Sequence, residues 1–94
     1  MKIKQLTTIN FEFKGDAKVT ALVLDDISAF TSRTKEIGQD FGRSWRLTNL
    51  TQDMTTAVVE STAPRQRKCV YAVAFDDLVA ATDLDRAQTV RKFI

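Results

Sequence analysis

Apolar and polar residues alternate along several segments of the chain, a pattern that is typical of strands with one buried face. The alternation predicts strands over residues 9–14, 18–24, 44–51, 55–62 and 69–75. Segment 69–75 carries the strongest strand signal, and we expect it to lie in the centre of a sheet. Gly15 and Asp16 separate the first two segments, and a glycine at a tight turn predicts that these two strands form a β-hairpin.

Two stretches change from alternation to helical spacing, each directly after a pair of aspartates. The first predicts a helix over residues 26–37 that ends at Gly38. The second predicts a short helix over 76–82, a break at Thr82-Asp83, and another helix over 84–93. An aspartate is a good N-cap because its carboxylate accepts hydrogen bonds from the first turn of a helix.

The two halves of the sequence resemble each other. Residues 21–31 align with residues 72–82, and each segment reads as an apolar strand, a double aspartate and a helix start. The pattern predicts two ββα half-repeats, over residues 1–43 and 44–94, that share one core. The alternative is chance recurrence, because aspartate is a common N-cap.

Length and composition then limit the architecture. A chain of 94 residues forms one domain, and 44% hydrophobic with 28% charged residues is globular rather than disordered material. The order of elements predicts a single α+β domain, in which an antiparallel sheet of four to five strands carries two to three helices on one face.

The candidate chemistry is sparse. The chain has no histidine and one cysteine, Cys69, so the usual general base and a thiolate zinc site are both absent. No dinucleotide, P-loop, zincin or nucleophile-elbow motif is present. The pairs Asp25-Asp26 and Asp76-Asp77 could bind a metal, but capping explains them more simply, and Cys69 is expected to pack rather than react. We therefore expect no enzyme activity, no cofactor and no metal.

Compartment follows from similar arguments. No apolar run reaches the roughly 18 residues of a membrane span, and the N-terminus lacks the apolar region of a signal peptide. A single cysteine rules out an intrachain disulfide. We expect a cytoplasmic protein with no membrane partner.

The best functional candidates are two basic clusters, one around the only tryptophan and one before segment 69–75. The predicted partner-binding residues are Arg43, Trp45, Arg46, Arg65, Arg67 and Lys68. Arginine beside an aromatic residue is common in protein interfaces and also grips phosphates. The simpler alternative is a solvated basic loop and a tryptophan in the core. The net charge of +2 favours a protein partner over nucleic acid.

These observations predict a small non-enzymatic binding protein that occupies the surface of a host or cognate protein. Trp45 and Arg46 would be the anchor, and residues 44–51 would form an edge strand able to pair with another chain, including a second copy in a homodimer. The small size and the general character of the sequence suggest an accessory protein of a phage or mobile element that inhibits a host factor. The alternative is a nucleic-acid-binding regulator that uses the arginine and lysine patch.

Overall fold

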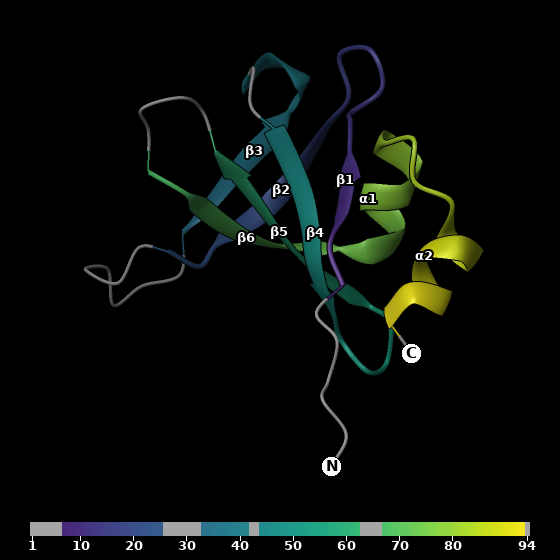
Figure 1. The fold of residues 1–94 in the computed structure, drawn as a ribbon. Helices are drawn as coiled ribbons and strands as arrows, with labels where there is room; N and C mark the ends of the chain where they lie inside the picture. The colour runs from purple at the N-terminus through teal and green to yellow at the C-terminus, as the bar shows by residue number, and fades with distance from the viewer. Residues whose placement is uncertain (1–6, 26–32, 42–43, 63–66, 94) are drawn as a thin grey trace.

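The computed structural model describes residues 7–25, 33–41, 44–62 and 67–93. They form an α+β fold with one six-stranded antiparallel sheet, in the strand order β1-β4-β5-β6-β2-β3 (Figure 1). The strands are β1 (Ile9–Phe11), β2 (Lys18–Val23), β3 (Thr34–Gly38), β4 (Ser44–Leu50), β5 (Thr56–Thr62) and β6 (Cys69–Ala74). The α+β class is confirmed, and the sheet has one strand more than the largest number predicted.

Alternation located most of these strands correctly. β2, β4, β5 and β6 lie within the predicted segments, and β6 has two strands or more on each side, as expected for a central strand. Along β5 the burial alternates residue by residue, with Ala57, Val59 and Ser61 buried. The same period therefore sets both the strand and its buried face.

The predicted hairpin between the first two strands is wrong. The turn itself forms, since Gly15 has a φ of 44° and the Ala17 N–H donates to the Lys14 carbonyl at 2.7 Å. β1, however, pairs with β4, and Phe11 lies opposite Trp45. β2 has no edge left for β1, because it pairs with β3 on one side and β6 on the other.

The predicted helix over residues 26–37 is also wrong where it can be checked. Residues 26–32 lie outside the described part of the chain, but residues 34–38 form strand β3, which pairs with β2. Pairing buries Ile37 completely, opposite Val19. Gly38 is not a helix cap. A Cβ there would come within 2.3 Å of the Ala17 carbonyl oxygen, so the close approach of β2 requires a glycine.

The edge strand was assigned incorrectly. β4 was expected at an edge of the sheet, yet it lies between β1 and β5, and the two edges are β1 and β3. An interior strand has its backbone hydrogen bonds satisfied on both sides. β1 covers residues 45–47 of β4, so this part of the strand cannot pair with another chain while the sheet is intact.

Two α-helices and one 3-10 helix complete the described elements: α1 (Phe75–Ala81), α2 (Arg86–Phe93) and η1 (Gln39–Phe41). The predicted break between the last two helices is confirmed. The capping is different, because Asp76 and Asp77 lie inside the first turn of α1 and make no cap hydrogen bond. Their negative charges still interact favourably with the positive end of the helix dipole. The next helix is capped by Asp85, whose Oδ1 accepts from the Gln88 N–H at 2.9 Å.

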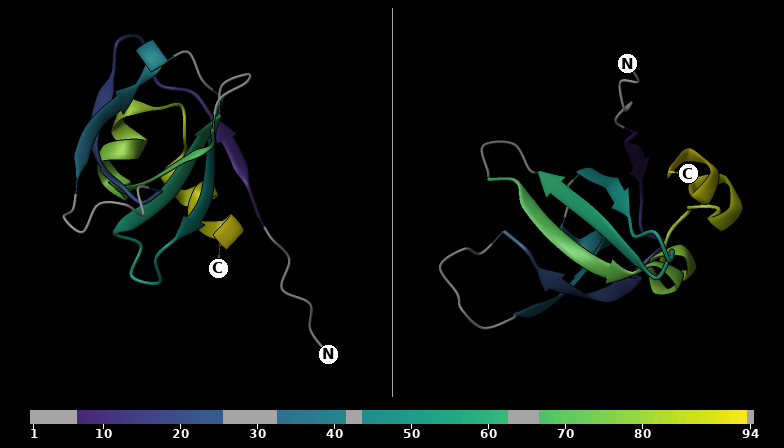
Figure 2. Two further views of the ribbon diagram at one scale, coloured as in Figure 1. Left: turned by 90° about the vertical axis from the view of Figure 1, so that its left-hand side faces the viewer. Right: turned by 90° about the horizontal axis from the view of Figure 1, so that it is seen from below.

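The sheet is strongly curved, and α1 lies inside the curve, where it contacts β2, β5 and β6 (Figure 2). Alternate residues of the strands and two residues of α1 make one core on this inner face. Its members are Phe11, Phe13, Val19, Ala21, Ile37, Trp45, Leu47, Ala57, Val59, Tyr71, Val73, Phe75 and Leu78. Val90 and Phe93 of α2 pack against the same core.

The predicted half-repeat stays a prediction. The second copy has its strand and helix in β6 and α1, but the helix start expected after Asp25 lies outside the described residues.

Candidate partner-binding surface

The six predicted partner-binding residues do not form one patch. Arg43 and Arg65 lie outside the described residues. Trp45 is buried in the core. Arg46 and Lys68 meet on the outer face of the sheet, whereas Arg67 lies at a hollow that also contains core-facing residues of β2 and β6.

Trp45 cannot be the surface anchor that the sequence suggested, because only 4% of the residue is exposed. Its ring packs against three other aromatic rings, with centroids 5.3 Å away for Phe13, 6.0 Å for Tyr71 and 6.2 Å for Phe11. The simpler alternative, a core tryptophan beside a basic loop, is therefore correct for this residue.

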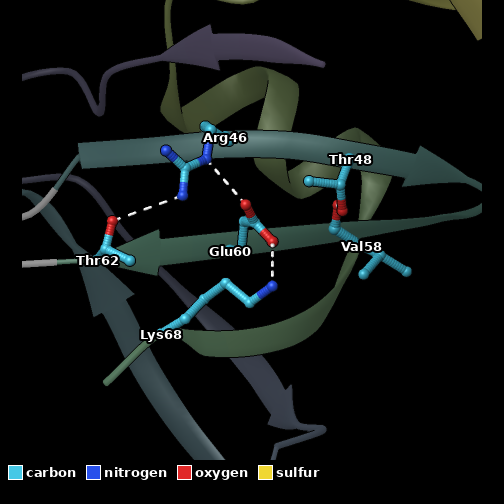
Figure 3. A network of polar contacts seen from close by, with 6 residues as sticks. All are labelled: Arg46, Thr48, Val58, Glu60, Thr62 and Lys68. Carbon is cyan, nitrogen blue, oxygen red and sulfur yellow. Dashed lines mark hydrogen bonds and ion pairs between the residues drawn. The ribbon is translucent and has the colours of Figure 1, made fainter. Parts of the chain in front are cut away.

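Arg46 and Lys68 converge on one carboxylate that the sequence analysis missed. The Arg46 Nε donates to Glu60 Oε1 at 2.8 Å, and Lys68 Nζ lies 3.4 Å from Glu60 Oε2 (Figure 3). The other Arg46 contact is an Nη2 hydrogen bond to Thr62 Oγ1 at 3.5 Å. Strand register explains the cluster, because Arg46 and Glu60 are direct partners on β4 and β5. One carboxylate thus offsets two cations, and the cluster keeps an excess of positive charge.

Beside this cluster the outer face is apolar. We call the outer strip the set formed by Leu22, Leu24, Val58, Val70 and Ala72. Ala72 lies opposite Leu22 on one side and Val58 on the other, which makes a continuous row across three strands. In the next row, the Leu24 N–H donates to the Val70 carbonyl at 2.8 Å, and Val70 lies opposite Glu60.

The outer strip is separate from the core. Among the described residues, none of its five members belongs to the core cluster or to the side chains packed against it, and both helices contact the opposite face. Leu24 is 45% exposed and the others are half-buried. Single exposed apolar residues are ordinary, but a contiguous apolar row with a polar border resembles the surface of an interface.

Arg67 contributes to a different feature at the same end of the sheet. Its Nη2 donates to the Asp25 carbonyl at 2.9 Å. It lies with two other cations, Arg33 and Lys35, around a hollow of about 340 Å³. Arg67 and Lys68 point to different sides because consecutive residues of an extended chain alternate in direction. We call this feature the basic hollow, and its remaining lining residues are Val23, Asp25, Cys69 and Tyr71.

The described residues show no group of three or more carboxylate or cysteine side chains able to hold a metal ion. Cys69 is half-buried, with its Sγ 3.7 Å from the Arg67 carbonyl. Neither described helix is long and apolar enough to span a membrane.

Comparison of the chain with protein-family models, with curated proteins and with solved structures gave no significant match. The function proposed below therefore rests on the geometry of this chain.

Proposed function

We propose that this protein binds another protein through the outer face of its sheet, with the outer strip at the centre of the interface. The observation that carries the proposal is the apolar row of Leu22, Ala72 and Val58 on the face opposite both helices. Burial of such a row releases roughly 25 cal/mol for each Å² of apolar area removed from water. The face of a hydrogen-bonded sheet also presents rigid contacts, which lowers the entropy lost on binding.

The border of the strip indicates the chemistry of the partner. Lys68 has a side chain that is 56% exposed, and Arg46 has one that is 33% exposed, while Glu60 between them is only 16% exposed. The accessible charge at this border is therefore positive. A partner that places apolar side chains on the strip and a carboxylate near Lys68 would match the surface.

A photo-crosslinking amino acid placed at Ala72 tests this proposal in cells of the organism that makes the protein. Ala72 lies in the middle of the outer strip. The matched control is the same amino acid at Ala80, which is exposed on α1, a helix that contacts the inner face. We expect a discrete adduct with another protein from position 72 and none from position 80.

Other outcomes contradict the proposal in different ways. An adduct of twice the mass of this chain would make a second copy the occupant of the strip, as in a homodimer. An adduct with nucleic acid would favour the alternative regulator. Equal labelling from both positions, or none from either, would remove the outer strip as a docking surface.

The nucleic-acid alternative has less support from the placement of the residues on which it depends. Arg46 and Lys68 are both paired with Glu60, and Arg67 lies apart from them. Phosphate binding would weaken by roughly 0.9 log units per log unit of salt for each contact, so a gel shift at low salt distinguishes the two functions. The finer form of our proposal, an inhibitor from a phage or mobile element that occupies a host factor, depends on the identity of the crosslinked protein.

A further inference from the structure

The inner face of β3 changes character along the strand. Ile37 lies fully buried in the core, but the preceding residues with the same direction, Lys35 and Arg33, are cationic and exposed. They lie where the core ends, beside Val23, whose N–H donates to the Arg33 carbonyl at 2.8 Å. Two cations thus replace apolar side chains in a core-facing row.

Arg67, two residues before β6 begins at Cys69, adds a third cation to this place. Its guanidinium is oriented by the hydrogen bond to the Asp25 carbonyl, which uses one of its five N–H donors. Among the described residues that line the basic hollow, Asp25 supplies the only carboxylate. In the described part of the hollow, three cationic side chains thus accompany one carboxylate, an excess of positive charge.

We propose that the basic hollow binds a small organic anion, with a carboxylate or phosphate group held by the cations and a short apolar body against Val23, Cys69 and Tyr71. A volume of about 340 Å³ is at the lower end of the range for small-ligand sites. A guanidinium suits this task because its planar fork matches the oxygens of both groups. This site does not depend on the function proposed for the outer strip.

A competing explanation is protection of the sheet edge. β3 is an edge strand, and charged side chains on an edge discourage pairing with other chains. Arg33 and Lys35 would serve that purpose without any ligand. Both also make contacts within the chain, so Arg67, which is not on β3, is the residue that separates the two explanations.

The test is a titration of the ¹⁵N-labelled protein with small anions, in which NMR measures the amide chemical shifts of Val23, Lys35 and Tyr71. Phenyl phosphate and benzoate are the probes, and benzyl alcohol is the neutral control with a similar body. We expect saturable shifts with one or both anions and no saturation with the alcohol. Arg67→Gln should weaken the anion affinity about tenfold or more, the effect of losing one charge-assisted hydrogen bond. Arg91→Gln on α2 removes the same charge elsewhere and should leave the affinity unchanged.

Three results would overturn the proposal. Shifts that never saturate would mean that the cations serve edge protection only. Equal weakening in Arg67→Gln and Arg91→Gln would mean that the anions respond to overall charge. A short single-stranded oligonucleotide that binds far more tightly than phenyl phosphate, with shifts extending beyond the hollow, would assign these cations to nucleic acid.

Discussion

Replacement of Trp45 by alanine distinguishes the core role of this residue from the anchor role that the sequence suggested. The residue is 4% exposed, and it touches the rings of Phe11, Phe13 and Tyr71. Truncation of a buried tryptophan costs about 3–5 kcal/mol, because it removes the transfer energy and leaves a cavity. Three ring contacts place the expected loss in the upper half of this range.

The stability lost in Trp45→Ala is large relative to the total free energy of unfolding. A chain of 94 residues has a free energy of unfolding of roughly 5–14 kcal/mol at the usual 0.05–0.15 kcal/mol per residue. Trp45→Ala should therefore remove about a third of the stability or more. An exposed anchor would behave differently, since surface substitutions usually change the stability by about 0.5 kcal/mol or less.

Urea denaturation followed by far-UV circular dichroism measures this difference. Fluorescence is unsuitable because Trp45 is the only tryptophan. Ser44→Ala is the matched control, since Ser44 is the exposed neighbour on the same strand and should behave as the wild type. A loss of less than about 1 kcal/mol for Trp45→Ala would refute the packing described here.

Three further substitutions test local features of the fold. Met54 has a φ of 62°, a left-handed conformation that glycine adopts without strain. Met54→Gly should therefore raise the free energy of unfolding by about 0.5–1 kcal/mol and raise the urea midpoint with it. A lower midpoint would contradict this. Thr82→Val should cost about 1–3 kcal/mol and speed amide exchange near the end of α1, because the buried Thr82 hydroxyl donates to the Leu78 carbonyl at 2.6 Å. Hydrogen bonds from the Thr51 hydroxyl and from Thr55 lower the pKa of Asp53 below the ordinary value of 3.8. The ionised Asp53 carboxylate therefore stabilises the fold above pH 3.8, and this stabilisation is lost as the pH falls through the lowered pKa of the folded state. The stability difference between wild type and Asp53→Ala should shrink accordingly in acid, and a difference that does not change with pH would contradict the turn geometry.

Most of the strands that the sequence predicted lie inside the sheet. β2, β4, β5 and β6 each have a neighbour on both sides, and the alternation of apolar and polar residues was enough to locate them; the short edge strand β1 was located in the same way. β3 was missed because its residues, Thr-Lys-Glu-Ile, have a helical spacing and few apolar side chains. Residues 34–38 become a strand because they pair with the edge of β2, and such a tertiary contact is not visible in a local sequence pattern.

The candidate surface was predicted only in part, for a related reason. Arg46 and Lys68 are in it, but Glu60 and the apolar strip were not expected there. The alternation along β5 does place Val58 and Glu60 on one face. The sequence does not show which face of the sheet the helices cover. That face depends on the packing of α1 inside the curved sheet, and this packing depends in turn on the order of the strands. The sequence also treated Arg67 and Lys68 as one patch, although the extended chain separates them.

The most direct test of the docking surface is the dissociation constant for the protein crosslinked from position 72, measured by calorimetry with Ala72→Arg and Ala80→Arg. A bulky charge at the centre of an interface should cost 2 kcal/mol or more, so we expect Ala72→Arg to weaken binding about 30-fold or more and Ala80→Arg to have no effect. Unchanged affinity in Ala72→Arg, with the fold intact by circular dichroism, would contradict the claim that this protein binds its partner through the outer face of the sheet.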